Sequence, residues 1–252
     1  RTMTLPMGLA MREAFGATVT ALADTDPRIV MLDGDLGTST RAEIFQRAHP
    51  ERFFQMGIAE QNMLGVAAGM ASAGLVPFVS TFVAFAVVRP LDQIRVLIAQ
   101  PGLNVKIMGG YAGLFVGAAG KTHQVVDDIA IMRAMPGMVT ISPADDVETA
   151  AAIRWAVTHD GPVYIRTVRD ATQRLFDDSY RFDAAKAVLV REGSDVTLIT
   201  TGAHTPRVVD AAAILAERGI DAHVLHVPVL KPLDTASIVD AAARTGLVVT
   251  VE

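Results

Sequence analysis

Glu60 is the residue whose surroundings most suggest catalysis. It lies in the segment FFQMGIAEQNMLG (residues 53–65), where a turn rich in glycine and methionine leads into a helix of small residues. A carboxyl group in apolar surroundings has a raised pKa, which suits it to acid–base catalysis. The alternative is that Glu60 only stabilises the start of the helix, where the helix dipole favours an acidic residue. The residue types alone leave both interpretations open.

His123 is a second candidate for moving protons. It lies in THQ (122–124) and follows the run GGYAGLFVGAAG (109–120), which contains too many glycines for a helix and predicts a mobile loop. Loops often carry binding and catalytic side chains, and histidine side chains commonly change charge near neutral pH. A structural role in the loop is the alternative, because no neighbouring acid identifies a partner.

Aromatic and basic side chains supply further candidates. Phe82 and Phe85 are three residues apart in STFVAF, a spacing that fits either a pair packed in the core or a flat apolar surface for a ring. Arg169 follows the strand-like segment VYIRT (163–167), so its guanidinium can reach the carboxyl end of that strand and hydrogen-bond to an anion there. An ion pair with the neighbouring Asp170 is the alternative.

Composition excludes several classes of protein. The chain has 252 residues, of which 51% are hydrophobic and 19% charged, and its formal net charge is -5, so it is expected to fold. It lacks a basic run for nucleic acid and an unbroken apolar stretch of about 20 residues for a membrane. It has no cysteine, which favours the cytoplasm. His223 and His226 are expected on opposite faces of a strand without a carboxylate beside them, and no metal site is predicted.

Helices and strands alternate along the first part of the chain, which is typical of an α/β fold with a doubly wound, mainly parallel sheet. Ligands of such sheets lie at the carboxyl ends of the strands. The expected helices cover residues 11–22, 61–73, 89–99, 126–135 and 144–158, and the expected strands cover 29–32, 76–80, 105–108, 138–142 and 163–167.

A smaller α/β domain is expected after a polar, acidic stretch. We place a first domain at residues 1–176, a linker at 177–185 and a second domain at 186–252. The second domain is short and ends on an apolar strand, so we expect it to be incomplete. Its predicted strands are 196–200, 222–227 and 247–251, and its predicted helices are 206–218 and 235–244.

Five short motifs carry a resemblance to a known family. The chain resembles the transketolase family of thiamine diphosphate enzymes, and most closely the C-terminal subunit of a split transketolase. The resemblance is nearly continuous over residues 11–169 and weaker to residue 252. The motifs are LDGDL (32–36), GIAEQN (57–62), STF (80–82), LDQIR (91–95) and THQ (122–124).

The resemblance implies a role for each candidate residue. Glu60 would hydrogen-bond to the N1′ atom of the cofactor's aminopyrimidine and so start catalysis, and His123 would face the reacting carbons and handle protons or a substrate hydroxyl. Cofactor contacts would come from Phe82, Phe85, Ile58 and Asp35, the last of which can also be a turn residue or support Glu60. The substrate, with its phosphate, would be held by Arg169, Ser39, Arg12, Tyr111 and His123.

Two departures from the family pattern concern the substrate. Tyr111 stands where the family commonly has the histidine of THAG, and residues 117–120 are GAAG where it commonly has GEDG. The resemblance therefore implies a transketolase that transfers a two-carbon ketol group between sugar phosphates with altered sugar specificity. Related alternatives are an enzyme like deoxyxylulose phosphate synthase, one like the beta subunit of 2-oxo acid dehydrogenase, and a catalytically silent structural paralogue.

The family's GDG motif for magnesium is absent, since residues 33–36 read DGDL. The resemblance therefore implies that an N-terminal, diphosphate-binding transketolase subunit holds the magnesium and the diphosphate. The active site would lie between the two chains in an α2β2 assembly, and the apolar composition is consistent with a large interface.

Overall fold

A seven-stranded sheet forms the larger part of the computed structural model, which describes residues 5–252. Its strand order is β12-β6-β7-β5-β4-β2-β3, and every neighbouring pair is parallel except β12 and β6. This confirms the predicted α/β class and the mainly parallel sheet. The strands are β2 (Ile29–Asp33), β3 (Phe53–Gln55), β4 (Val76–Phe82), β5 (Lys106–Gly110), β6 (Val139–Ile141), β7 (Val163–Arg166) and β12 (Val229–Lys231).

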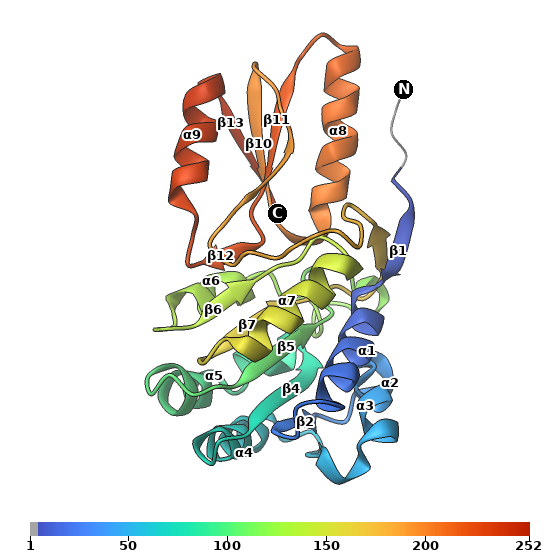
Figure 1. Ribbon diagram of the computed structural model, residues 1–252, viewed down its shortest axis with the longest axis vertical. Helices are drawn as coiled ribbons and strands as arrows, with labels where there is room; N and C mark the ends of the chain where they lie inside the picture. Colours follow the sequence, from blue (N-terminus) through green and yellow to red (C-terminus); the bar gives the residue numbers. More distant parts are fainter. Residues whose placement is uncertain (1–4) are drawn as a thin grey trace.

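Helices cover both faces of this sheet (Figure 1). Along β2, Ile29 and Met31 join the core beneath α1, α3 and α7, whereas Val30 and Leu32 join the core beneath α4 and α6. Both faces of each central strand are therefore buried, which explains their unbroken apolar sequences. The helices are α1 (Met11–Ala23), α2 (Gly37–Thr40), α3 (Ala42–Ala48), α4 (Glu60–Ser72), α6 (Asp128–Ala134) and α7 (Asp146–Thr158).

The segment predicted as a helix over 89–99 is divided. A π-helical turn covers Ala84–Val88, the chain bends at Arg89 and Pro90, and α5 (Leu91–Gln93) then continues into a second π-helical stretch, Ile94–Ala99. Proline has no amide hydrogen to donate, so the helical hydrogen bonding restarts beyond it, and the carbonyl of Pro90 accepts from the amide of Ile94 at 2.9 Å. Arg89 is thus outside the helix that the sequence predicted for it.

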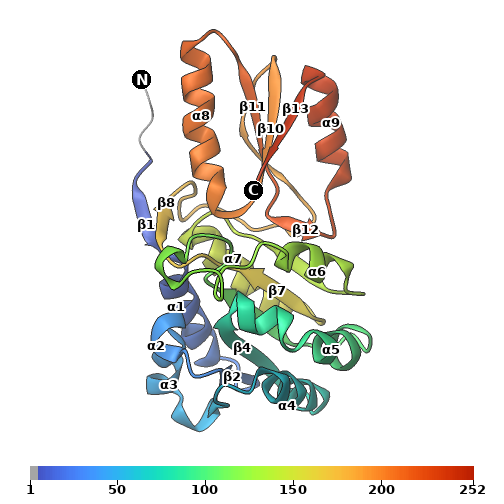
Figure 2. The ribbon, with the colours of Figure 1, turned by 180° about the vertical axis from the view of Figure 1, so that it is seen from behind.

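A four-stranded sheet of order β13-β10-β11-β9 forms the smaller part of the molecule (Figure 2). One helix covers each face: α8 packs beside Val196 and Val224, and α9 packs beside Leu225. This confirms the smaller α/β domain. The elements are β9 (Val188–Arg191), β10 (Val196–Thr200), α8 (Thr205–Glu217), β11 (Ala222–His226), α9 (Thr235–Thr245) and β13 (Val248–Val251).

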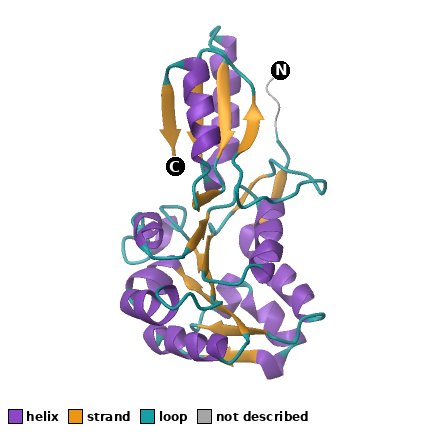
Figure 3. Cartoon of the chain, turned by 60° about the vertical axis from the view of Figure 1, so that its left-hand side comes forward, coloured by secondary structure: helices purple, strands orange, loops and turns teal. Residues whose placement is uncertain are grey.

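The chain crosses between the two parts more than once, which the sequence did not predict. After β11 the chain returns to the larger sheet as β12 and pairs antiparallel with β6. A two-stranded ribbon, β1 (Met7–Ala10) with β8 (Ala171–Gln173), lies beside α1 (Figure 2). Figure 3 shows the strands of both parts with the helices that cover them. Among residues 5–252 no helix is long and apolar enough to cross a membrane.

A buried polar network also joins the two parts. Glu148, at the start of α7, has its Oε2 atom 2.8 Å from His226 Nε2 on β11, and its Oε1 accepts from the Tyr180 hydroxyl at 2.6 Å. His226 Nδ1 lies 2.8 Å from Thr205 Oγ1. The prediction that no carboxylate stands beside His226 was wrong, because Glu148 comes from a distant part of the chain. The side chains of Glu148 and His226 are fully buried.

Candidate active site

Glu60 is the first residue of α4, and its side chain is only 5% exposed. Its Oε1 accepts a hydrogen bond from Arg89 Nη1 at 3.0 Å. Both interpretations of Glu60 are thus compatible with its position, since it lies in the first turn of a helix and is also a buried carboxylate. A cleft of about 510 Å³ opens beside it, lined by Ile58, Ala59, Glu60, Gln61, Asn62 and Arg89.

Arg89 was not predicted as a site residue. Its guanidinium carbon lies 4.1 Å from the centre of the Phe85 ring, a cation–π contact, while Nη1 holds Glu60. Phe85 belongs to the π-helical turn that precedes Arg89. The sequence predicted no helix over Phe85, so no local pattern pointed to this contact.

The aromatic pair lies at the carboxyl end of β4. The rings of Phe82 and Phe85 are stacked, with centroids 6.0 Å apart and planes inclined by 24°. The imidazole of His123 meets both rings edge-on, at 5.2 Å from Phe85 and 6.0 Å from Phe82, and its Nδ1 lies 2.8 Å from Thr122 Oγ1. The structure thus brings His123, which is distant in the sequence, against the neighbouring candidates Phe82 and Phe85.

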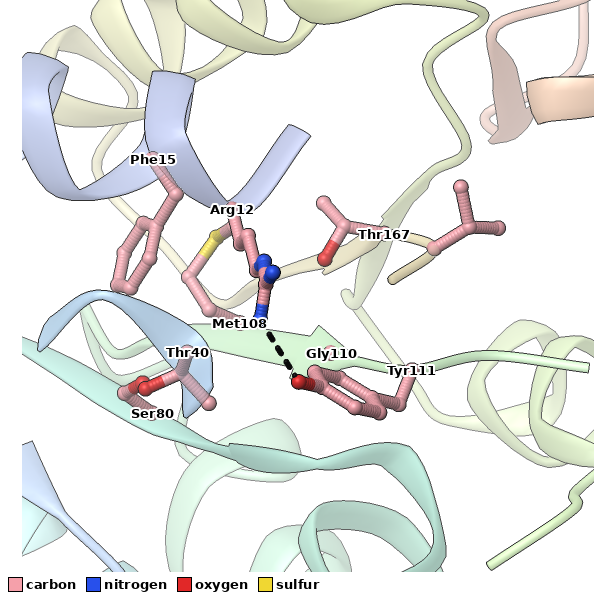
Figure 4. Close-up of a pocket in the computed structure, with 9 residues that line it drawn as sticks. Arg12, Phe15, Thr40, Ser80, Met108, Gly110, Tyr111 and Thr167 are labelled. Atoms are coloured by element: carbon pink, nitrogen blue, oxygen red, sulfur yellow. Dashed lines mark hydrogen bonds between the residues drawn. The ribbon is translucent and has the colours of Figure 1, made fainter. Parts of the chain in front are cut away.

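Tyr111 continues this aromatic group toward α1. Its ring stacks on Phe82 with centroids 3.8 Å apart, and its hydroxyl accepts from Arg12 Nη1 at 2.9 Å (Figure 4). The same hydroxyl donates to the carbonyl oxygen of Ser39 at 3.3 Å. Arg169 lies over the Tyr111 ring at 5.9 Å, and its Nη1 also donates to Asp170 at 2.9 Å. Arg169 therefore forms the ion pair with Asp170 that was the alternative to phosphate binding, and it also lies beside Tyr111, another residue expected to contact substrate.

Asp33 and Gln55 connect the two loops that precede Glu60 through hydrogen bonds. Asp33 Oδ2 accepts from Gln55 Nε2 at 3.0 Å, and burial raises the pKa of Asp33. Gln55 Oε1 accepts from the backbone amides of Asp35 and Gly57, both at 3.0 Å. Gln55 is thus a positioning residue that the sequence did not reveal, because its partners belong to two separate loops.

Asp35 and Ile58 lie at the exposed rim of the site. Asp35 is exposed and has a φ of 63°, and within residues 5–252 its carboxylate makes no hydrogen bond to Glu60. Support of Glu60 by Asp35 is therefore absent from the described structure. Ile58 is 73% exposed, so both side chains are available to a bound molecule or a second chain.

The arrangement fits the aminopyrimidine part of the implied cofactor. Glu60 presents a carboxylate acceptor at the open cleft, and Arg89 connects it to the partly buried ring of Phe85, which stacks on Phe82. Magnesium requires several oxygen ligands at one point. The part of the chain that the structure describes holds no group of three or more histidine, aspartate or glutamate side chains placed to bind a metal.

Comparisons with known proteins agree with the resemblance. Residues 7–174 match the family described as "Transketolase, pyrimidine binding domain", and residues 185–252 match "Transketolase, C-terminal domain". The first match alone covers more than half of the chain.

Curated relatives and a solved structure extend over nearly the whole chain. The "Putative transketolase C-terminal section" of Methanocaldococcus jannaschii is 41% identical over 96% of this chain and 76% of its own length. The "6-deoxy-6-sulfo-D-fructose transketolase subunit SqwH" of a Clostridium species is 40% identical over 96% and 75%. The structure named "Split gene transketolase, inactive beta4 tetramer" is 43% identical, covers 97% of this chain and 80% of that one, and has a TM-score of 0.89.

Proposed function

Because the chain belongs to the transketolase family, we propose that it is the pyrimidine-binding subunit of a two-chain transketolase. The observation that carries this proposal is the buried carboxylate of Glu60, which faces an open cleft beside Phe85 and the edge of His123. The substrate class is sugars and their phosphates. The name of the SqwH relative supports an unusual sugar for some members of the family.

The proposed reaction moves two carbons between sugars. In the donor ketose the bond between C2 and C3 breaks and a shortened aldose leaves, and the two-carbon unit then forms a bond to the carbonyl carbon of an acceptor aldose. Thiamine diphosphate, when bound, supplies the carbon that carries the two-carbon unit between these steps. The exchange needs no oxidant or reductant, so the protein's task is to orient groups, exclude water and move protons.

Glu60 would hold a proton between its Oε1 and a ring nitrogen of the cofactor. That oxygen is bound by Arg89 in the described structure, so a ring nitrogen and the guanidinium compete for it. Phe82 and Phe85 would exclude water from the ring, which strengthens a hydrogen bond to a carboxylate. His123, at the edge of both phenylalanines, would exchange a proton with a substrate hydroxyl.

A second chain is required by the same proposal. The diphosphate and its magnesium would be held by an N-terminal transketolase subunit, with two copies of each chain in an α2β2 assembly. Exposed apolar side chains near the cleft support association: Ile58, Val88, Leu91, Val96 and Leu97 are each at least 37% exposed. A surface of this kind marks an interaction site.

Reconstitution with the diphosphate-binding chain tests the function. We expect ketol transfer from a ketose or from its phosphate by the mixed chains, and none by either chain alone. Glu60→Gln should lower kcat by at least about 100-fold, since acid–base groups contribute on the order of 10²–10⁴, whereas Glu51→Gln, at an exposed carboxylate, should not. Turnover by Glu60→Gln at the wild-type rate would refute the role of Glu60.

The same assay separates the related alternatives. Consumption of pyruvate with a triose phosphate, instead of a ketose donor, would indicate the synthase-like activity. A complex that assembles but binds no thiamine diphosphate would indicate a structural paralogue.

A further inference from the structure

Tyr111 stands where the three residues expected to hold a sugar's phosphate meet. Arg12 Nη1 donates to its hydroxyl at 2.9 Å, and that hydroxyl donates to the Ser39 carbonyl oxygen at 3.3 Å. The guanidinium of Arg169 lies 5.9 Å from the centre of the ring. The expected phosphate ligands are therefore arranged around a phenol that this chain supplies itself, and Figure 4 shows its contact with Arg12.

The phenol is fixed in place. Tyr111 is 7% exposed, and its ring stacks on Phe82 with centroids 3.8 Å apart and planes inclined by 22°. Its φ of 63° lies in the left-handed region, which is unusual for an aromatic residue, so the contacts of the side chain must hold this backbone conformation. Tyr111 therefore forms a rigid wall that does not yield to an incoming ligand at low cost.

The space behind Tyr111 is too small for a phosphate. The cavity there is about 10 Å³ and is lined in part by Arg12, Ser80 and Thr167. Arg12 Nε and Ser80 Oγ are buried and find no hydrogen-bond partner among residues 5–252. A cavity of this size holds at most one water molecule, which these two polar atoms could bind in an otherwise apolar lining.

The positive charge available to a phosphate on the open side of Tyr111 is also reduced. Arg12 directs Nη1 to two neutral oxygens, those of Tyr111 and Ser39. Arg169 faces the open side but pairs with Asp170 at 2.9 Å. A phosphate dianion is bound well by two guanidinium groups that converge on it, whereas Arg12 Nη1 is directed here to Tyr111 and Ser39.

We propose that Tyr111 takes the place of the substrate's terminal phosphate, so that the enzyme uses sugars without a phosphate ester at the end distant from the carbonyl. The proposal rests on the proposed ketol transfer and narrows its substrate class. Tyr111 is then a specificity-determining residue, which replaces the phosphate's contacts to Arg12 with its own hydroxyl.

Paired donors test this in the reconstituted complex. D-xylulose and D-xylulose 5-phosphate are compared with glycolaldehyde as the common acceptor, and the readout is the ratio of kcat/KM for the phosphate ester over that for the free sugar. We expect a ratio of about 1 or less for the wild type. Tyr111→His should raise it at least about tenfold because it frees both space and Arg12 Nη1. Tyr111→Phe, which keeps the ring, should leave it within about threefold.

Further variants assign the gained preference to Arg12. Adding Arg12→Met to Tyr111→His should remove the gain, whereas adding Arg47→Met, at an exposed arginine outside the site, should not. A wild-type ratio above about 100, or an unchanged ratio in Tyr111→His, would overturn the proposal.

Titration of the full chain with inorganic phosphate gives a second readout that does not depend on turnover. Calorimetry should detect saturable binding to Tyr111→His and at least tenfold weaker binding to the wild type. Equal binding to both would overturn the role of Tyr111. If the complex transfers no ketol group to any sugar but the chains still differ in phosphate binding, the proposed function is refuted. The exclusion of phosphate by Tyr111 is then still established.

Discussion

Two buried carboxylates, Glu60 and Glu148, have opposite surroundings. Glu148 is fully buried, with partners from the backbone of Ala144, from Tyr180 and from His226. Within the described residues Glu60 receives one hydrogen bond, from the half-exposed Arg89, and opens onto a cleft. A carboxylate whose hydrogen bonds are complete stabilises the fold, whereas one with unused capacity at a cleft is available for chemistry.

Removal of each carboxylate should give the largest contrast. Glu148→Ala removes the partner of His226 Nε2, of the Tyr180 hydroxyl and of the Ala144 amide in a buried network, so we expect the free energy of unfolding to fall by about 3–5 kcal/mol. Glu60→Ala should change it by less than about 1 kcal/mol, because its partner is half exposed and returns to water. Urea denaturation of both variants measures this. Equal losses would remove the distinction between the two carboxylates.

Lys106 is a further buried ionisable residue, and its protonation makes the stability of the fold depend on pH. It is fully buried, its Nζ donates to the carbonyls of His159 and Gly161, both at 2.8 Å, and burial lowers its pKa from 10.5 to about 7. Between these values the unfolded chain binds a proton that the folded chain does not, so stability rises with pH. We expect a gain of about 2 kcal/mol from pH 7 to pH 9, measured by denaturation.

Two lysine variants test whether Lys106 causes this pH dependence of stability. Lys106→Met should flatten the rise in stability between pH 7 and pH 9, whereas Lys186→Met, at an exposed residue, should preserve it. A rise that persists in Lys106→Met would show that other groups cause it.

Arg89 should give the smallest effect, and it appears in cofactor binding rather than in stability. Because its guanidinium competes for Glu60 Oε1, Arg89→Met in the assembled complex should tighten thiamine diphosphate binding about 3- to 10-fold, in keeping with the modest strength of half-exposed ion pairs. Calorimetry measures the dissociation constant. Arg95→Met, at an arginine that pairs with Asp92, is the control. Weaker binding in Arg89→Met would show that Arg89 assists the cofactor.

Residues with strong local signals were predictable. Both faces of the central strands are buried, so their apolar sequences indicated the sheet, and the motifs around Glu60, Phe82 and His123 indicated the site. Arg89 and Gln55 were missed because their roles depend on partners that only the fold brings near. The strands β3, β8 and β12 have three residues each, which is too short for a clear periodic pattern.

Because the chain returns to the larger sheet at β12, the segment that matches the family and the segment that completes the sheet end at different residues. The match to the pyrimidine-binding family ends at residue 174, yet the larger sheet is completed only by Val229–Lys231. A fragment that stops between these points leaves the edge of β6 unpaired, and unpaired edges of this kind promote aggregation. A protein that contains the pyrimidine-binding domain must therefore also contain a strand equivalent to β12, or another chain must cover the edge of β6.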